Sequence, residues 1–234
     1  MLTERSFVAY SEDFKDEMLL KAIPHDENIS GWIDLPPHTN VATAFDAVSH
    51  EGKQFSLSEM TNGGNMYQYI ESLNLNLALT VPLSYIELIY DCTLQLAMGL
   101  EFAHNNGLVH GQFDLSNVVI AKDTENVVYK ITDFKPATSM AMPLTTEGAL
   151  WPFARHKKKI SDAEKLELLM LKDIYALGIC MLEMMIGRVS ATKFSISLDS
   201  LPLTWAEFPE STPLIQVLVE CINIDSISQR KGKL

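Results

Sequence analysis

The sequence predicts an α+β fold in which a small β-rich part precedes a larger helical part. Short apolar segments separated by turn residues fill the chain up to about residue 60, a pattern that is typical of hairpins. Longer segments with apolar residues at helical spacing follow. With 234 residues and 47% hydrophobic content, the chain is long enough to bury a substantial core as one domain or as two small lobes.

Two hairpins are expected in the first part. Residues 6–10 and 17–23 are short apolar segments on either side of a charged turn, and residues 42–48 and 54–59 flank a turn at residues 50–52. One weak helix is expected among the short strands of the first part, which extends to about residue 69. The run Thr-Asn-Gly-Gly at residues 61–64 ends this pattern, and we therefore predict a first unit from residue 1 to 62 and a helical unit from 63 to 234.

Three helices are predicted in the second part. Residues 84–105 carry an apolar stripe, with Ser84 and Glu87 as an expected capping-box pair at the start. Residues 174–186 are apolar nearly all round, which predicts a buried central helix that opens at Asp173. Residues 212–222 form an amphipathic pattern that is entered through Thr-Pro, and proline suits the first turn of a helix.

Charge and cysteine usage exclude several classes of function. A formal net charge of −12 repels phosphate backbones, so nucleic acid is not the expected partner. The three cysteines lie far apart in apolar helical patterns, which predicts buried thiols of a reducing compartment. The start of the sequence lacks a signal pattern, and no apolar run approaches the length of a bilayer span. We expect an intracellular protein, cytoplasmic or cytoskeletal, without a membrane partner.

A strand-loop-strand segment carries the polar residues that point to a function. His110 is followed by Gly111, Gln112 and, further on, Asn117, and the next strand ends at Asp133-Phe-Lys. This segment resembles the catalytic core of the eukaryotic-type protein kinase superfamily, which has His-Arg-Asp, an Asn five residues after that Asp, and Asp-Phe-Gly about twenty residues on. In this comparison glycine replaces the arginine and Gln112 replaces the catalytic aspartate.

Other segments resemble the same family in the same order. Residues 32–41 are similar to the link between the small-lobe helix and the fourth strand, and residues 55–64 to the hinge, with Ser58 at the gatekeeper position. Residues 173–183 are similar to the central helix of the large lobe, whose first aspartate organises the catalytic-loop backbone. Residues 221–230 are similar to a segment near the end of the family domain. The resemblance implies a kinase-like bilobal fold with a truncated N-lobe at 1–62 and a helical C-lobe at 63–234 that lacks its last helix.

The resemblance also implies a vestigial nucleotide pocket. Its candidate residues are Lys21, Ser58, Glu59, Thr61 and Val119, the last where a side chain packs under adenine. Lys21 is either the phosphate-binding lysine or a solvent-facing lysine on an edge strand, and both interpretations stay open. Glu27 is either its partner or a surface carboxylate. No Gly-x-Gly-x-x-Gly lies upstream, so the backbone amides that would cradle the phosphates are missing.

The expected metal site is altered as well. Asn117 and Asp133 are a possible metal pair, which we expect to hold no ion, or they only hydrogen-bond the local backbone. Lys135 stands where the family has glycine, and its ammonium is expected to compete with a divalent cation or to neutralise Asp133. Asp114 is a rescuing base only if it acts from a position displaced by two residues.

These departures lead to a functional expectation. A neutral amide at Gln112 cannot accept the proton of a substrate hydroxyl, so we expect a pseudokinase rather than an enzyme. We expect a scaffold or interaction module that binds other proteins, within a larger assembly, and no cofactor, although weak binding of ATP and magnesium stays open. The alternatives are an atypical active Ser/Thr protein kinase, a nucleotide-binding regulatory domain, and a truncated product of a longer chain.

Overall fold

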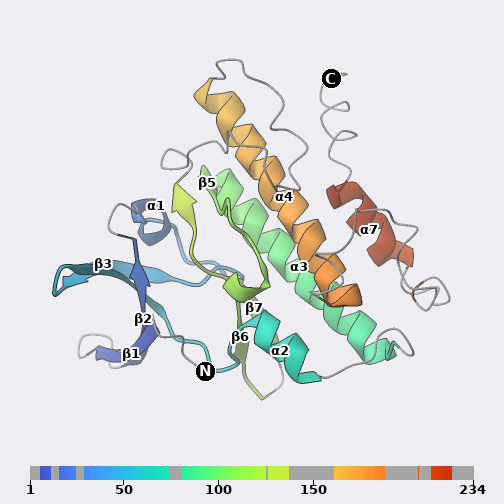
Figure 1. Ribbon diagram of the computed structural model, residues 1–234, viewed down its shortest axis with the longest axis horizontal. Coiled ribbons are helices and arrows are strands. Elements are labelled where there is room, and N and C mark those ends of the chain that lie inside the picture. The colour runs from blue at the N-terminus through green and yellow to red at the C-terminus, as the bar shows by residue number, and fades with distance from the viewer. Residues whose placement is uncertain are drawn as a thin grey trace.

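A computed structural model gives the arrangement of the chain. It describes residues 6–11, 16–24, 29–73, 81–124, 126–136, 161–187, 205 and 212–222. Figure 1 shows a β-sheet at one side of the molecule and long helices at the other, with small strands between them.

The sheet is built from the two predicted hairpins. Strands β1 (Ser6–Ser11) and β2 (Asp16–Ile23) pair antiparallel, as do β3 (Ala44–His50) and β4 (Lys53–Glu59). The order is β1-β2-β4-β3, so the two hairpins join through β2 and β4. Glu51 and Gly52 both adopt positive φ, 49° and 73°, which is the backbone that a two-residue hairpin turn requires. Both hairpin predictions are confirmed.

A single turn of helix links the two hairpins. Helix α1 (Ser30–Ile33) buries Trp32, whose indole Nε1 donates to the Ala42 carbonyl at 2.8 Å. The short helix α1 agrees with the expectation of one weak helix in the first part of the chain. Helix α2 (Met66–Leu73) follows the sheet. The domain boundary at residue 62 stays a prediction.

In the part of the chain that the structure describes, three longer helices form the other side: α3 (Leu83–Asn105), α4 (Asp162–Ile186) and α7 (Thr212–Ile222). The expected capping box is absent, because the N-cap of α3 is Pro82 and makes no side-chain bond. Helix α4 begins at Asp162, so Asp173 lies inside this helix and does not open it. The start of this helix was predicted too late because its first turns are more polar than the segment from residue 174 onward.

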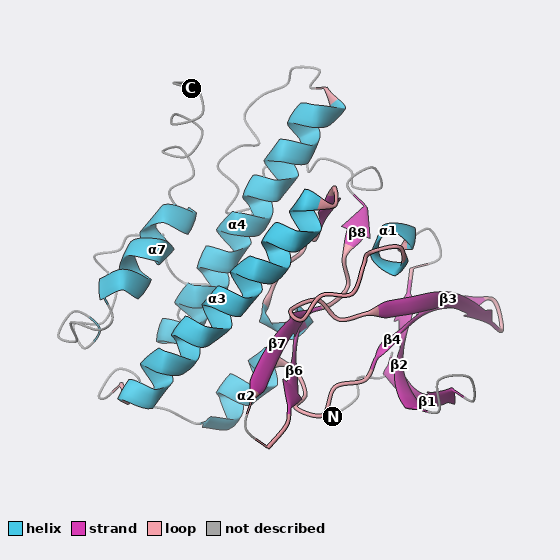
Figure 2. Cartoon of the chain, turned by 180° about the vertical axis from the view of Figure 1, so that it is seen from behind, coloured by secondary structure: helices cyan, strands magenta, loops and turns pink. Residues whose placement is uncertain are grey.

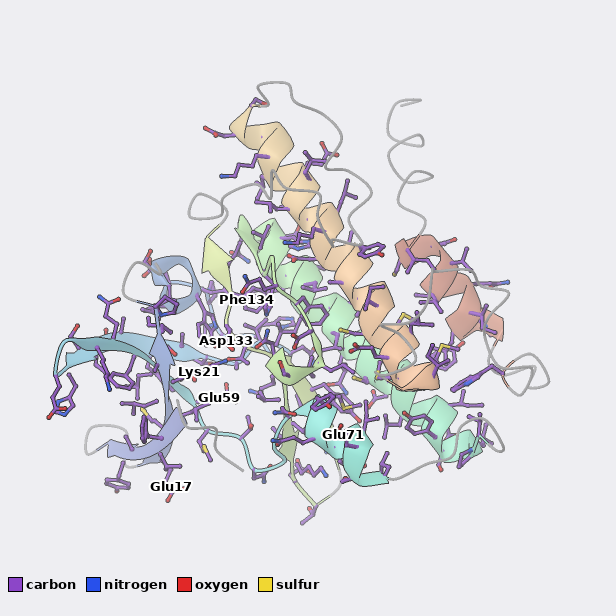
Figure 3. The ribbon with its side chains drawn as sticks, viewed as in Figure 1. Glu17, Lys21, Glu59, Glu71, Asp133 and Phe134 are labelled. Carbon is purple, nitrogen blue, oxygen red and sulfur yellow. The ribbon has the colours of Figure 1, made fainter. Side chains whose placement is uncertain are left out.

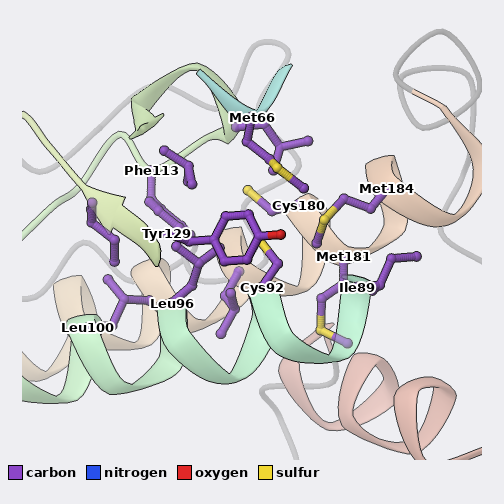
Figure 4. Close-up of a cluster of buried hydrophobic side chains, with 14 of the residues drawn as sticks. Met66, Ile89, Cys92, Leu96, Leu100, Phe113, Tyr129, Cys180, Met181 and Met184 are labelled. Carbon is purple, nitrogen blue, oxygen red and sulfur yellow. The ribbon is translucent and has the colours of Figure 1, made fainter. Parts of the chain in front are cut away.

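The main core lies between α3 and α4. Figure 4 shows Met66, Ile89, Leu96, Met181 and Met184 meeting there around Tyr129. Cys92, Cys180 and Cys221 form no disulfide bond and are buried, as predicted. Burial raises the pKa of the Cys92 thiol far above its ordinary value, so this thiol stays protonated. Within the described ranges, no helix combines the length and apolar character needed to cross a membrane.

Short strands carry the segment that the sequence singled out (Figure 2). Strand β5 (Leu108–Val109) pairs with β8 (Lys135–Pro136), and β6 (Val118–Lys122) pairs with β7 (Val127–Ile131). The short 3₁₀ helix η1 (Leu115–Asn117) precedes β6. The pairings β5–β8 and β6–β7 therefore bring the loop that begins at His110 close to residues 132–134.

The segment before β3 is fastened to this region. The Ala42 amide donates to the Ile131 carbonyl at 2.8 Å, and the Ile131 amide donates to the Asn40 carbonyl at 3.0 Å. Gly99 of α3 lies directly beneath, where a Cβ atom would stand 2.6 Å from the Asn40 oxygen. Since backbone occupies this space, only glycine fits without a shift.

Because the backbone at Asn40 lies so close to Gly99, we predict that replacing this glycine by alanine destabilises the protein, although the same change usually stabilises a helix. Gly→Ala inside a helix normally stabilises by up to about 1 kcal/mol. At Gly99 we expect Ala to lower the free energy of unfolding by about 1–3 kcal/mol, because Cβ overlaps the Asn40 backbone. Urea denaturation measures the change, with Glu101→Ala on the exposed side of α3 as the control. A Gly99→Ala protein as stable as wild type would show that the strand segment can move away.

Candidate functional site

A pocket of about 160 Å³ opens between β2 and the segment from β5 to β8. Its wall combines the end of β2 and the residue after it with polar side chains from the loop segments. The lining residues are Lys21, Ala22, Ile23, Pro24, His110, Gln112, Asn117 and Asp133. The sequence analysis singled out five of these, and the structure brings those five together. Ile23 was missed, although it shares the face of Lys21 because side chains alternate along a strand.

An ion pair spans the pocket. The Lys21 ammonium contacts the Asp133 carboxylate, which comes from the segment after β7, and Figure 3 shows these two side chains facing one another. Strand β2 is flanked by β1 and β4, so Lys21 is not on an edge strand. Its side chain remains 39% exposed, against 17% for Asp133. Glu27 lies outside the described residues.

Among the described side chains, the cation in contact with Asp133 is Lys21. The backbone of Lys135 lies in β8, and its side chain is outside the described set. Asp133 adopts a φ of +66°, an unusual conformation for a residue other than glycine. Such backbone positions gather at functional sites, where the surrounding structure holds them.

A buried carboxylate organises the loop at residues 110–112. Asp173 of α4 accepts hydrogen bonds from the His110 amide at 2.7 Å and the Gly111 amide at 2.6 Å, and lies 3.0 Å from the imidazole of His104. Asp173 is fully buried, so these partners compensate the cost of burying its charge. The role that the family resemblance implied for this aspartate is confirmed. Gly111 has a φ of 71°, which glycine adopts without strain.

His110 is held in its neutral form. Its Nε2 lies 2.9 Å from the Thr132 carbonyl, and its Nδ1 accepts from the Gln112 amide at 3.3 Å. Both contacts fit a ring protonated at Nε2 only. Burial lowers the pKa of His110 below its ordinary value, and the nearby Asp173 only partly opposes this. The ring also packs against Phe113 and Phe134, with centroid distances of 5.4 and 5.3 Å.

Asn117 has one end fixed by the loop. Its side-chain nitrogen donates to the main-chain carbonyl of Gln112 at 3.1 Å. The main-chain carbonyl of Asn117 accepts from the Thr132 amide at 3.0 Å. The other polar atom of this side chain is an amide oxygen. Asn117 and Asp133 together supply amide and carboxylate oxygens, which are ligands that magnesium accepts when phosphate oxygens and water complete its shell. Within the described ranges, no cluster of three or more His, Cys, Asp or Glu could hold a metal.

The side chain of Asp114 caps the short helix η1. Its carboxylate accepts from the Ser116 amide at 2.7 Å and from the Ser116 hydroxyl. It does not line the pocket. The rescuing-base role of Asp114 therefore stays a prediction.

The four hinge and adenine candidates also stand apart from the pocket wall. Ser58 is buried in β4 between Leu19 and Ala44, and Thr61 follows the strand. Glu59 pairs with Lys130 of β7 at 2.5 Å and accepts from the Thr43 amide at 2.9 Å. Val119 lies in β6 opposite Lys130. Glu59 thus links the sheet to β7, and none of the four residues lines the cavity around Lys21.

The sequence as a whole was compared with known families. A family described as "Protein tyrosine and serine/threonine kinase" matches residues 29–198, most of the chain. The chain belongs to the protein kinase family. The match includes the loop held by Asp173 and the Asn117 and Asp133 positions.

Individual kinases are similar at low identity. "Probable serine/threonine-protein kinase PknB" of Lactococcus lactis is 24% identical over 76% of this chain and 26% of its own length. Human "Dual specificity testis-specific protein kinase 2" is 26% identical over 80% of this chain and 33% of its own length. The chain thus spans about a quarter to a third of these relatives. The kinase domain of Mycobacterium tuberculosis PknI superposes with a TM-score of 0.61 at 16% identity, covering 93% of this chain and 82% of that domain. This confirms the kinase-like α+β fold.

The relatives contradict one expectation. They are named as protein kinases, which points to an enzyme, whereas Gln112 led us to expect none. The physical reason lies in the transition state. Phosphoryl transfer depends mostly on positioning and electrostatic stabilisation, and a general base contributes only a part, about 10²–10⁴-fold. Replacing the base lowers the expected rate and does not by itself exclude the reaction.

The neutral state of His110 predicts how stability depends on pH. Its pKa in the folded protein lies below 6.5, so the unfolded chain binds the proton more readily. Its contribution to stability is constant above pH 6.5 and falls as the pH drops below that value, by at most about 1.4 kcal/mol per pH unit. His110→Phe should therefore differ less from wild type at pH 5 than at pH 7.

Urea unfolding across this pH range measures the effect, with His50→Gln as the control because that histidine is 77% exposed. If the gap between wild type and His110→Phe widens towards acid, the ring is charged in the folded protein.

The ion pair predicts a response to magnesium. Because Lys21 and a divalent cation compete for Asp133, millimolar magnesium alone should leave the melting temperature of wild type unchanged and should raise that of Lys21→Met. Each kcal/mol of binding corresponds to about 2–4 °C in a domain of this size. Differential scanning fluorimetry checks this, with the exposed Lys53→Met as the matched control. Equal shifts in all three proteins would place the magnesium elsewhere.

Proposed function

We propose that this chain is an ATP-dependent phosphotransferase domain of atypical composition that acts slowly on a hydroxyl group of a protein. The observation that supports it is the convergence of Lys21, Asp133, Asn117 and Gln112 on one pocket. A lysine, a carboxylate and an amide are the groups that this reaction needs for the phosphates and their metal ion.

In this proposal Lys21 binds the phosphates and Asp133 binds their metal ion. The ammonium binds a phosphate oxygen once it leaves the carboxylate, and Asp133 and Asn117 hold magnesium, which would neutralise charge on the transferring group. The 39% exposure of the Lys21 side chain leaves it accessible to a ligand. Phosphate and Asp133 compete for one ammonium, so some binding free energy is spent in separating the ion pair.

Gln112 takes a positioning role. An amide oxygen accepts a hydrogen bond from a substrate hydroxyl but does not remove its proton at neutral pH. Gln112 is exposed on the pocket wall, where an acceptor hydroxyl can reach it. We expect weak ATP affinity as well, because the Lys21 ammonium must leave Asp133 before it can bind a phosphate oxygen.

A second role as an interaction module is favoured by one strand. Strand β1 is at the edge of the sheet, and Phe7, Val8 and Tyr10 are 52%, 42% and 65% exposed. Exposed apolar edge strands tend to be covered by another chain. We propose that partners are proteins of a larger assembly, and the charge of −12 disfavours nucleic acid and anionic membranes. An intracellular setting, cytoplasmic or cytoskeletal, suits three cysteines that form no disulfide bond.

Transfer of labelled γ-phosphate from ATP to a generic protein substrate tests the enzymatic proposal. Wild type should transfer slowly, Asp133→Asn should lose the activity, and Gln112→Asp should raise the rate by about 10²–10⁴-fold, because a carboxylate restores the base. Lys53→Met, away from the pocket, should match wild type. Circular dichroism of each variant verifies folding. Transfer by wild type no faster than by Asp133→Asn, together with no gain in Gln112→Asp, would refute the proposal.

A further inference from the structure

The outer side of helix α3 carries an exposed apolar line. Tyr90, Leu94 and Met98 follow one another at intervals of four residues and are 38%, 61% and 47% exposed. Residues four apart lie above one another on a helix, so the three side chains form one stripe. Leu83, 54% exposed, lies on the same side at the start of the helix. Figure 2 shows α3 on the near side of α4.

This stripe is not required by the core. The opposite side of α3 already supplies the buried residues, among them Ile86, Ile89 and Leu96. A helix at the surface of a domain normally presents polar residues to water. Single exposed apolar residues are common, but an aligned row with a buried face behind it indicates a surface that binds something.

Acidic residues frame the stripe. Glu87 precedes Tyr90 by less than one turn, Glu101 follows Met98 at the same interval, and Asp91 adjoins Tyr90; all three are exposed. Helix α3 contains no lysine or arginine. The strip is therefore electronegative along its length, within a chain of net charge −12.

The charges decide between possible occupants. A second copy of this chain would bring two acidic strips together, and an anionic membrane or a nucleic acid would add phosphates to carboxylates. A helix with leucine-like residues on one face and lysine or arginine beside them matches both features. The distance from Glu87 to Glu101 is about 21 Å along the axis, which about four turns of a partner helix cover.

We propose that the outer face of α3 docks a basic amphipathic helix of a partner protein. Its apolar residues at i, i+3, i+4 and i+7 pack on Tyr90, Leu94 and Met98, and its basic residues pair with Glu87, Asp91 and Glu101. None of the residues that line the pocket lies on α3. The docking face is thus distinct from the phosphotransfer site, and its test does not depend on that activity.

Fluorescence anisotropy with a labelled peptide tests the proposal on the full chain. The probe is a designed Leu/Lys helix about 18 residues long, compared with a scrambled peptide of the same composition and with a Leu/Glu helix. The Leu/Lys helix should bind the wild-type protein, and the two comparison peptides should bind at least about tenfold more weakly. Leu94→Lys should weaken binding of the probe by about tenfold or more, since it removes the central contact and adds repulsion. Glu101→Lys should weaken binding mainly at low salt.

Val217→Lys on α7 is the matched control, because that valine is also 42% exposed. It should keep wild-type affinity, and thermal unfolding should show all variants folded. Equal binding to Leu94→Lys, or equal affinity for the scrambled peptide, would overturn the proposal. Concentration-dependent dimerisation that Leu94→Lys abolishes would make a second copy the occupant, and binding of phosphatidylserine vesicles through the same residues would make it a membrane. Either result would also overturn the proposal.

Discussion

The buried carboxylate of Asp173 is the contact on which the rest of the site depends. It holds the backbone of His110 and Gly111 from α4 and reaches His104 of α3, so a single charged group joins two long helices to the loop. Burial of a charge is unfavourable unless hydrogen bonds compensate it, which makes the arrangement cooperative. The fixed His110 ring then contacts the Thr132 carbonyl, next to Asp133 in sequence. The position of the pocket carboxylate therefore follows from a residue that does not line the pocket.

The sheet is attached to this framework by charges at two places. Lys21 of β2 contacts Asp133, and Glu59 of β4 contacts Lys130 of β7. The first pair faces the pocket and is available to a ligand, whereas the second is only 18% and 22% exposed and lies outside it. A phosphate that binds Lys21 must displace Asp133, while the second pair can keep the sheet in place. Under the proposed function, binding of a phosphate breaks the attachment at Lys21 and leaves the one at Glu59 intact.

Local signals in the sequence predicted the helices and strands well. Contacts between residues far apart in the sequence could not be predicted from them. Turn residues and apolar periodicity gave both hairpins and the helices that the structure has at Leu83–Asn105 and Thr212–Ile222. The capping pair at Ser84 failed because Pro82 begins the helix, and Asp173 was placed at a helix start because the earlier turns of α4 are more polar. The contact between Lys21 and Asp133 joins residues 112 positions apart. No local pattern could choose between Lys135 and Lys21 as the partner of that carboxylate.

Glutamine at position 112, where the family has its catalytic aspartate, shows why the identity of one residue is a poor guide to whether a site is active. A general base worth about 10²–10⁴ in rate corresponds to about 3–5 kcal/mol of transition-state stabilisation. Most of the acceleration in phosphoryl transfer comes instead from fixed charges around the phosphates. In this chain those charges are present but satisfy one another, since Lys21 and Asp133 are paired. Separating a partly exposed ion pair costs only about 1 kcal/mol or less. Under the proposed function, the amide at Gln112 is therefore the larger barrier to activity, and separation of Lys21 from Asp133 is the smaller one.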